Sequence, residues 1–183
     1  MSKIVFKGRT SDGIPYIIRY PKRTDLQEMW RYINELSKEQ TFISFQGEEI
    51  SLKEERAFLN DSLKKINQKK GLLLLVETDG KIVGVSDVRM KPRISSHIGT
   101  FGITIAKEFR SKGIGKKLME ILMLEAKKLK GLRILELQCF ANNPIAPDLY
   151  KSCGFKEYGR LPKGIAYKDG FVDDILMYYE IKS

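Results

Sequence analysis

The sequence predicts an α/β fold built on a mixed sheet. Short segments rich in β-branched and apolar residues alternate with longer amphipathic segments. The pair Asp79-Gly80 joins two of the short segments and is a strong hairpin signal. A helix-like segment from about Gly113, with apolar residues at helical spacing, directly follows another short segment. Because no internal repeat or Pro- and Ser-rich linker interrupts this order, we expect one domain over residues 1–183.

The short apolar segments are the expected strands of this sheet. In chain order they are residues 3–7, 14–19, 72–77, 82–89, 99–105, 134–141, 155–161 and 171–181. The longest uninterrupted apolar run, Leu72 to Val76, is far shorter than the ~20 residues that a membrane-spanning helix needs. The first residues also lack the apolar core of a signal peptide, so we expect a cytoplasmic protein without a membrane partner.

Four helices are expected from apolar spacing and capping residues. Thr24 is a good N-cap for the first helix, and Ser51 for the second, with Glu54 completing a capping box. The third begins at about Gly113, and a short fourth helix covers residues 146–153. Pro147 fits that fourth helix only as a first-turn residue, since proline lacks the backbone N–H that a helix interior needs.

The composition limits the partners and cofactors. The 33 Lys and Arg residues exceed the 23 Asp and Glu residues, so the net charge of +10 favours anionic partners. These residues are spread along the chain, which is typical of a solvated surface; we therefore do not expect a nucleic-acid partner. Cys139, Cys153 and the single His97 do not form a recognisable zinc set, so no metal is expected. A homodimer is the commonest oligomer, but no feature of the sequence selects it.

The segment from Ile103 to Leu118 carries the strongest chemical signal. A strand ends there, a turn with Gly113 and Gly115 follows, and a helix begins. The unpaired N–H groups and the positive dipole end of such a helix start form a phosphate site. A P-loop would need Gly at position 110 and Ser or Thr at 117, and a dinucleotide fingerprint would need Gly near 118, so neither motif fits. A purely structural glycine turn is the alternative from these residues alone.

Two blocks of residues resemble the GNAT acetyltransferase superfamily. The run Arg110-Ser111-Lys112-Gly113-Ile114-Gly115 is similar to that superfamily's pyrophosphate loop. The second block is similar to its asparagine-to-tyrosine helix and the following Gly-Phe pair, and comprises Asn143, Ala146, Leu149, Tyr150, Gly154 and Phe155. The resemblance implies a mixed, mostly antiparallel central sheet of about seven strands, flanked by helices and splayed at the cofactor site. It also implies an N-acetyltransferase that moves the acetyl group of acetyl-coenzyme A (acetyl-CoA) to a primary amine by direct attack in a ternary complex.

The same resemblance assigns roles to individual residues. It places the pantetheine arm of the cofactor along the backbone of the strand before the glycine loop, and the pyrophosphate on backbone N–H groups of the loop. The residues implied to bind the cofactor are Ile103, Thr104, Ile105, Arg110, Ser111, Lys112, Gly113, Ile114, Gly115, Lys116 and Asn143. Tyr150 is implied to protonate the leaving thiolate, since a phenol with a pKa of about 10 is protonated near neutral pH. The position of Pro147 bears on how Asn143 would meet the cofactor.

No general base can be assigned from the sequence. Related sequences often carry a glutamate in the strand before the loop, where this chain has Thr100. Asp87 and Glu136 on neighbouring strands could act through water, and His97 is a further, weaker candidate. The missing glutamate also leaves open a non-catalytic acetyl-CoA sensor as the alternative function.

The acceptor amine is expected to meet two loops, residues 41–50 and 163–170. Glu48 and Glu49 in the first loop could attract a cationic amine, and Asp173 and Asp174 on the last strand add carboxylates. This pattern favours a polyamine, an amino acid or the N-terminus of a peptide or protein as the acceptor, without choosing among them.

Overall fold

A computed structural model describes residues 3–181, which form an eight-stranded sheet and four α-helices. The strands are β1 (Ile4–Arg9), β2 (Pro15–Arg19), β3 (Gly71–Thr78), β4 (Lys81–Met90), β5 (Ile98–Ile105), β6 (Ile134–Phe140), β7 (Lys156–Tyr167) and β8 (Gly170–Glu180). The helices are α1 (Leu26–Lys38), α2 (Leu52–Asn67), α3 (Ile114–Ala126) and α4 (Ala146–Ser152). The order of strands across the sheet is β1-β2-β3-β4-β5-β6-β8-β7.

The mixed, mostly antiparallel sheet is confirmed, with eight strands where about seven were expected. The pairs β1–β2, β2–β3, β3–β4, β6–β8 and β7–β8 are antiparallel, whereas β5 and β6 run parallel. The parallel ladder joins Ile98–Thr100 to residues 134–136. The expected splay beyond this ladder stays a prediction.

The described chain forms two compact units, and β5 contributes residues to both. The first unit comprises residues 3–89 and 102–130, and the second comprises residues 90–101 and 131–181. The expected single domain over residues 1–183 stays a prediction.

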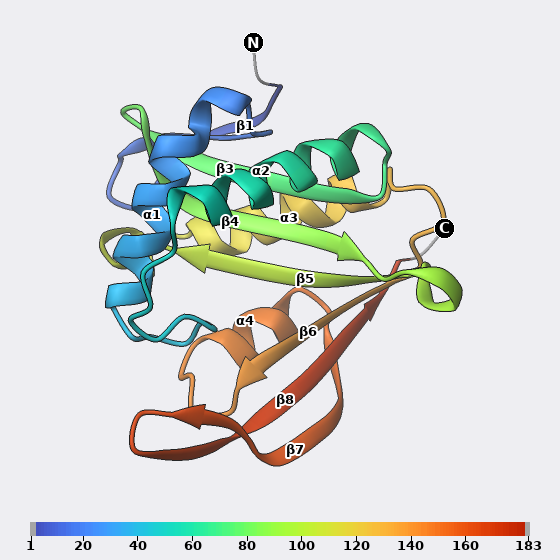
Figure 1. Ribbon diagram of the computed structural model, residues 1–183. Coiled ribbons are helices and arrows are strands. Elements are labelled where there is room, and N and C mark those ends of the chain that lie inside the picture. Colours follow the sequence, from blue (N-terminus) through green and yellow to red (C-terminus); the bar gives the residue numbers. More distant parts are fainter. Residues whose placement is uncertain (1–2, 182–183) are drawn as a thin grey trace. The chain divides into compact units, whose positions relative to one another are not determined.

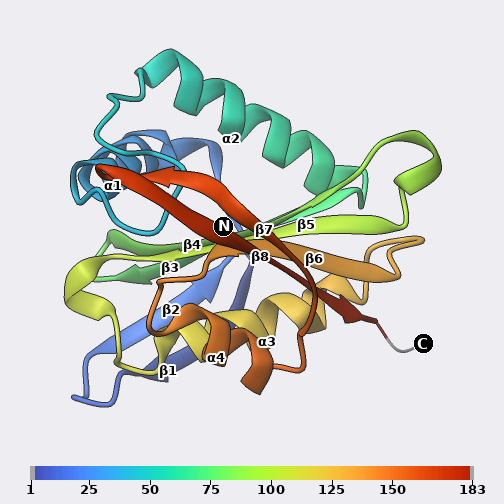
Figure 2. The ribbon, with the colours of Figure 1, turned by 90° about the horizontal axis from the view of Figure 1, so that it is seen from below.

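In the first unit, helices cover both faces of the sheet. Helices α1 and α2 lie on one face and α3 lies on the other (Figures 1 and 2). Strand β3 is therefore buried along nearly its whole length, which explains its continuous apolar run Leu72 to Val76 in place of an alternating pattern.

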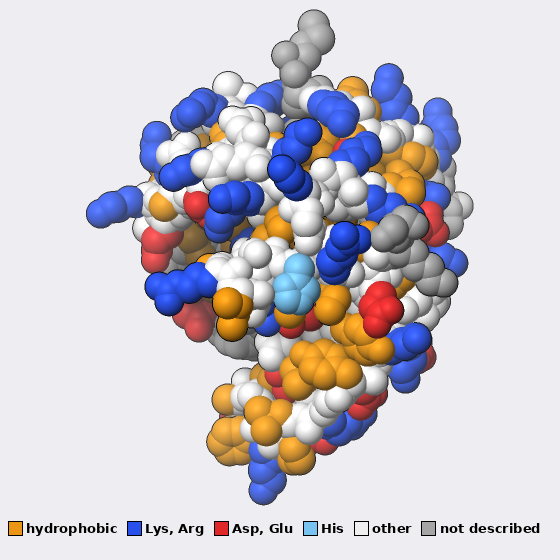
Figure 3. Space-filling view, turned by 90° about the vertical axis from the view of Figure 1, so that its right-hand side faces the viewer, with side chains coloured by type: hydrophobic (Ala, Val, Ile, Leu, Met, Phe, Trp, Pro, Cys, Tyr) orange, Lys and Arg blue, Asp and Glu red, His pale blue; other side chains and the backbone are white. Residues whose placement is uncertain are grey.

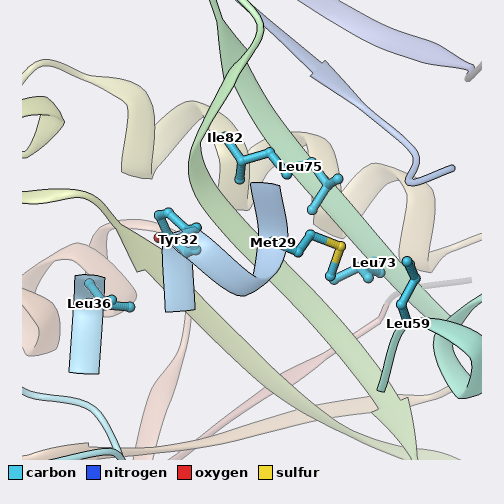
Figure 4. Packing of buried hydrophobic residues seen from close by; sticks show 7 residues of the cluster. All are labelled: Met29, Tyr32, Leu36, Leu59, Leu73, Leu75 and Ile82. Carbon is cyan, nitrogen blue, oxygen red and sulfur yellow. The ribbon is translucent and has the colours of Figure 1, made fainter. Parts of the chain in front are cut away.

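The core between the two-helix layer and the sheet is a cluster of seven buried side chains, shown in Figure 4. Its members are Met29, Tyr32, Leu36, Leu59, Leu73, Leu75 and Ile82. On the opposite face, α3 buries Ile114, Leu118 and Leu122 completely, because these residues recur at helical spacing.

The starts of the first two helices differ in how well the sequence predicts them. The capping box of α2 is confirmed: Glu54 N donates to Ser51 Oγ at 3.2 Å, and Ser51 N donates to Glu54 Oε2 at 2.8 Å. The prediction that Thr24 caps α1 is wrong, because residues 23–25 form a 3₁₀ turn and Asp25 takes the cap position. Asp25 is fixed there by the buried Arg19, whose guanidinium donates to both carboxylate oxygens at 2.7 and 2.9 Å.

The second unit is built on β6, β8, β7 and α4. Strand β8 pairs with β6 on one side and with β7 on the other. Aromatic rings fill part of its interior, with Phe155 in contact with Phe101, Tyr150 and Tyr179 at centroid distances of 5.8, 6.1 and 5.6 Å. Pro147 lies in the first turn of α4, as predicted.

The charged surface agrees with the spread of basic residues along the chain. Lys and Arg side chains are scattered over the face shown in Figure 3 and do not gather in one patch. Among residues 3–181, no helix has the length and apolar character needed to cross a membrane.

Candidate functional site

The glycine loop between β5 and α3 has a backbone that depends on two left-handed residues. Strand β5 ends at Ile105, a 3₁₀ turn covers residues 107–109, and α3 starts at Ile114. Ser111 and Gly113 have φ angles of 59° and 83°, and only glycine adopts such angles without cost. Gly113 therefore permits the sharp entry into α3 that the sequence indicated.

The start of α3 has free capacity for an anion. Gly113 is the N-cap residue, and because it has no side chain it forms no capping hydrogen bond. The first N–H groups of a helix have no intrahelical acceptor, and the dipole makes this end positive. A Cβ at Gly113 would meet no described atom within 4 Å, so the space over the loop is open. These features fit the pyrophosphate of a coenzyme A molecule.

Arg110 holds the loop in place through contacts with two other segments of the chain. Its Nε donates to the Ile105 carbonyl at 2.9 Å, and its Nη2 donates to Glu39 Oε2 at 2.5 Å. Glu39 is the C-cap residue of α1. The Arg110 guanidinium thus ties the end of β5 and the end of α1 to the loop, and its expected contact with the cofactor stays a prediction.

Lys112 ties the same loop to the β1–β2 turn. Its Nζ lies 2.7 Å from Asp12 Oδ2, and its carbonyl accepts a hydrogen bond from Ser11 N at 3.2 Å. Hydrogen bonding from Lys112 lowers the pKa of Asp12. Lys116, on the first turn of α3, is exposed. Arg110 and Lys112 thus form contacts that hold the loop in place, whereas the side chain of Lys116 is exposed to solvent.

The end of β5 is held from one face by α1. Tyr32 on α1 is 3% exposed and donates its hydroxyl hydrogen to Thr104 Oγ1 at 2.9 Å. Burial raises the pKa of Tyr32 above its ordinary value, so this hydroxyl stays protonated. Ile103, Thr104 and Ile105 are half-buried and lie immediately before the glycine loop. These three residues form the end of a strand that is hydrogen-bonded to α1 through Tyr32. No local pattern in the sequence indicates this contact.

Asp87 on β4 has its carboxylate beside Gly102 of β5 in the first unit. A Cβ at Gly102 would lie 2.9 Å from Asp87 Oδ1, so the carboxylate occupies the space of a missing side chain. Asp87 Oδ2 is buried without a hydrogen bond, although Arg89 Nε lies 2.8 Å away. Burial raises the pKa of Asp87. Asp87 is therefore more than a solvated surface carboxylate.

In the second unit, Tyr150 is buried on α4. It is 8% exposed, and its ring meets Phe101 edge-on at a centroid distance of 6.2 Å. Burial raises the pKa of Tyr150, with a smaller contribution from Cys139. The phenol thus remains a proton donor over the whole neutral range. Its role towards a thiolate stays a prediction.

Asn143 uses its side-chain oxygen within the chain. Asn143 Oδ1 accepts hydrogen bonds from the backbone N–H groups of Ile145 and Ala146, both at 3.0 Å. The asparagine therefore anchors the start of α4, next to Pro147. A contact between Asn143 and the cofactor stays a prediction.

The other candidate bases of the second unit are engaged or exposed. Glu136 Oε1 lies 2.5 Å from Lys91 Nζ and accepts a hydrogen bond from Thr100 Oγ1 at 3.4 Å. His97 is exposed, and its carbonyl accepts from Arg133 N and Ile134 N. Glu136 is therefore a paired carboxylate.

The two neighbouring acids on β8 have different surroundings. Asp173 Oδ1 accepts from Lys163 N at 3.1 Å, and Asp173 Oδ2 lies 3.6 Å from Arg160 Nη1. Asp174 is 7% exposed, its Oδ1 has no hydrogen-bond partner, and burial raises its pKa. Residues 163–170, expected as a loop, instead belong mostly to the paired ends of β7 and β8.

The expected acceptor loop, residues 41–50, is irregular and is fixed to α1. Trp30 Nε1 donates to the Ile50 carbonyl at 2.7 Å, and Asn34 exchanges hydrogen bonds with the same residue. Glu48 and Glu49 are exposed. Glu48 Oε2 accepts a hydrogen bond from Gln46 N, so the loop presents one engaged and one further carboxylate from a fixed backbone.

Sequence reasoning missed two residues that support the loop, Tyr32 and Glu39. Both lie on α1, far in sequence from their partners Thr104 and Arg110. Tyr32 reads as an ordinary core residue and Glu39 as a surface charge, so no local signal marks either one. Among the described residues, no group of three or more His, Cys, Asp or Glu side chains could hold a metal ion.

Comparisons with known proteins agree with this geometry. Residues 30–155 match the Acetyltransferase (GNAT) family. Over 101 residues the chain is 30% identical to the L-amino acid N-acetyltransferase AaaT of Escherichia coli (strain K12). That match covers 54% of this chain and 62% of the relative, so less than two thirds of the relative's length is spanned.

Solved structures share the fold. A GNAT-family acetyltransferase from Streptococcus pneumoniae superposes with a TM-score of 0.84 at 30% identity, covering 91% of this chain and 99% of that one. RimL, a ribosomal L7/L12 alpha-N-protein acetyltransferase in complex with coenzyme A, gives a TM-score of 0.78 at 13% identity, covering 98% of each chain. The fold, the glycine loop and the match over residues 30–155 together show that this chain belongs to the Acetyltransferase (GNAT) family.

Proposed function

We propose that this chain is an N-acetyltransferase that moves the acetyl group of acetyl-CoA to a primary amine by direct attack in a ternary complex. The observation that carries the proposal is the uncapped start of α3 behind the left-handed Gly113, in a chain of the GNAT family. Acetyl-CoA supplies the acetyl group as a thioester with a good leaving group. The chain's own residues bind that cosubstrate, orient it and move protons.

The cofactor half of the proposal rests on the first unit. Backbone N–H groups from Ser111 to Lys116 hold the pyrophosphate, since the start of α3 offers no side-chain acceptor to compete. Backbone groups of Ile103 to Ile105 bind the pantetheine arm, and one N–H there polarises the thioester carbonyl. Coenzyme A is bound in the structure of RimL, which shares this fold.

Tyr150 acts as the general acid in this proposal. Its buried phenol stays protonated at neutral pH, and it can give its proton to the departing thiolate. Replacement of the phenol by a phenyl ring would keep the contacts with Phe101 and Phe155 and remove only this proton.

The acceptor is proposed to be the α-amino group of an amino acid or of a peptide or protein N-terminus, with a polyamine as a further possibility. The partial relative AaaT is an L-amino acid N-acetyltransferase, and RimL is an alpha-N-protein acetyltransferase. An α-amino group has a pKa near 8, so more of it is neutral at physiological pH than of a lysine side chain. Glu48 and Glu49 on the fixed loop 41–50 would attract the remaining cationic form.

The test is a thiol-release assay with acetyl-CoA and a panel of amines. The panel holds free amino acids, peptides with varied N-termini, spermidine, and the same peptides with a blocked N-terminus. Calorimetry measures cofactor binding separately, because binding and turnover must be distinguished. We expect amine-dependent thiol release with at least one free α-amine and none with the blocked peptides.

Two outcomes would overturn the proposal in different ways. Cofactor binding without turnover on any amine of the panel would favour the acetyl-CoA sensor. Failure to bind coenzyme A at all would remove the cofactor site itself. A third outcome, turnover restricted to spermidine, would keep the activity and select the polyamine as the acceptor.

A further inference from the structure

A carboxylate from β4 fills the position where β5 has no side chain. Asp87 Oδ1 would lie 2.9 Å from a Cβ built at Gly102, and no other atom would come closer than Asp87 Cγ at 4.0 Å. Gly102 thus makes room for Asp87 alone. Since side chains alternate along a strand, positions 102 and 104 share one face of β5. The carboxylate therefore lies on the face where Thr104 meets Tyr32 of α1.

Three other carboxylates of the first unit are tied to arginines on other elements. Glu39 is taken by Arg110, and the carboxylates of Asp25 and Glu77 are taken by Arg19. Asp87 is 15% exposed and pairs through Oδ2 with Arg89 of its own strand, whose Nε lies 2.8 Å away, whereas its Oδ1 faces Gly102 of β5. Burial of a carboxylate is costly even when an arginine pairs with one of its oxygens, so the retention of Asp87 at this position points to a role other than stability.

We propose that Asp87 is the general base of the acetyl transfer and takes a proton from the acceptor ammonium. The proposal rests on the proposed function, because Ile103 to Ile105, which directly follow Gly102, are the segment assigned there to the thioester. This proposal supplies a base although Thr100 stands where related sequences often have a glutamate. The Asp87 carboxylate comes from the neighbouring strand and lies beside Gly102, two positions further along β5.

The proton and bond changes balance as follows. The ammonium nitrogen gives one proton to the Asp87 carboxylate, which later releases it to water. The neutral nitrogen then forms a bond to the acetyl carbon, and the carbon–sulfur bond breaks. The sulfur takes a proton from the general acid, and the second proton of the nitrogen restores that acid through water, so the products are the N-acetyl amide, coenzyme A thiol and one proton in solution.

The charges around Asp87 set the direction of its pH dependence. Burial raises its pKa, whereas Arg89 on its own strand and Lys65 on α2 oppose that rise. A base acts in its ionised form, so kcat/KM rises as the pH rises through the pKa of Asp87. This limb lies above the ordinary Asp range, near 4, and is separate from the limb that the amine itself contributes at higher pH.

The first test compares Asp87→Asn with Asp79→Asn, the same change in the exposed β3–β4 turn. We expect Asp87→Asn to lower kcat by about a hundredfold, within the range for general bases, and to lose the lower pH limb. Calorimetric binding of acetyl-CoA should be unchanged in both variants. Without substrate, thermal unfolding should show Asp87→Asn gaining stability over the wild type as the pH rises, because ionising the buried carboxylate costs stability.

A double-mutant cycle uses the contact with Gly102. Gly102→Ala in the wild type forces the Asp87 carboxylate aside, so kcat should fall about tenfold or more. In an Asp87→Ala background the same glycine change meets no carboxylate and should have little further effect. Equal losses from Gly102→Ala in both backgrounds would show a direct effect on β5 and would count against the proposal.

The results separate failure of the base from failure of the function. If the wild-type protein turns over no amine, the proposed function is wrong, and no general base is then needed. A wild-type protein that is active, with an Asp87→Asn variant of unchanged kcat and pH profile, removes Asp87 only. Loss of acetyl-CoA binding in Asp87→Asn would assign the residue to cofactor binding and overturn its role as base.

Discussion

Arg110 in the glycine loop and Glu39 at the end of α1 form an ion pair of 2.5 Å, although the two residues lie far apart in the sequence. The same guanidinium also bonds the Ile105 carbonyl, so one side chain holds three segments together. Hydrogen bonds to charged groups contribute about 1.5–3 kcal/mol each, which is enough to order a short loop. These contacts predict that Arg110 acts on cofactor binding by positioning the loop.

Removing either partner of this pair should weaken cofactor binding without abolishing it. We expect Arg110→Ala to raise the Kd for coenzyme A by about tenfold or more, and Glu39→Gln by a smaller factor, because the loop must then be ordered on binding. Arg31→Ala is the matched control, since within residues 3–181 the ion pairs of Arg31 are with Glu28 and Glu35 on the same helix. Calorimetry with coenzyme A gives the three values.

Two results would contradict the positioning role. If Glu39→Gln binds coenzyme A as the wild type does while Arg110→Ala loses all binding, Arg110 contacts the cofactor itself. If Arg31→Ala weakens binding as much as Glu39→Gln, the loss comes from α1 in general and not from the pair of Arg110 and Glu39.

Local patterns predicted most of the fold because they report local causes. The Asp79-Gly80 hairpin and the Ser51–Glu54 capping box each depend on residues a few positions apart, and both are present. Thr24 failed as a cap because Arg19, from the preceding strand, fixes Asp25. A contact made through tertiary folding decided that helix start.

The candidate site divides in the same way. Gly113 has a left-handed φ angle, and a glycine in the sequence already indicates a position where such an angle is needed. Tyr32 and Glu39 act through partners on other elements, and Asp87 gains its significance from the absent side chain of Gly102. No periodicity or spacing links these pairs, so only the folded chain reveals them.

Gly113 should have two separable roles, one in stability and one in binding. Its φ of 83° is nearly the same as the 82° of Gly131, and a Cβ at either residue meets no described atom within 4 Å. Gly113→Ala and Gly131→Ala should therefore each cost about 1 kcal/mol of unfolding free energy, the left-handed penalty for an L-residue. Only Gly113→Ala should also weaken coenzyme A binding, because the left-handed backbone at Gly113 positions the N–H groups of the proposed phosphate site.

Urea unfolding and calorimetry on the two glycine variants measure these effects independently. Equal loss of coenzyme A affinity in both would mean that lower stability alone weakens binding. Unchanged affinity in Gly113→Ala would move the phosphate site away from the start of α3.

Tyr150→Phe should lower turnover while leaving the fold and cofactor binding intact. The phenyl ring keeps the packing against Phe101 and Phe155, and only the hydroxyl is lost. We expect kcat to fall by about a hundredfold, as for loss of a general acid. Because burial raises the pKa of Tyr150, the wild-type profile should show no limb from this phenol between pH 6 and 9. Tyr179→Phe, whose ring also contacts Phe155, is the control and should keep full activity.

Glu55 on α2 gives a pH dependence of stability that is independent of catalysis. The residue is 6% exposed, and burial raises its pKa to about 7 in the folded chain. Its carboxyl is neutral in the folded state at pH 5 and ionised at pH 8, whereas the unfolded chain ionises it near pH 4.5. A raised pKa means that stability is highest at low pH and is lost as the pH rises from about 4.5 through about 7. Glu55→Gln should therefore match the wild type near pH 4.5 and have the higher Tm at pH 8. Thermal unfolding from pH 4.5 to pH 8 measures this difference in Tm, with Glu108→Gln at an exposed position as the control. A difference between Glu55→Gln and wild type that stays constant with pH would show that Glu55 ionises normally in the folded protein.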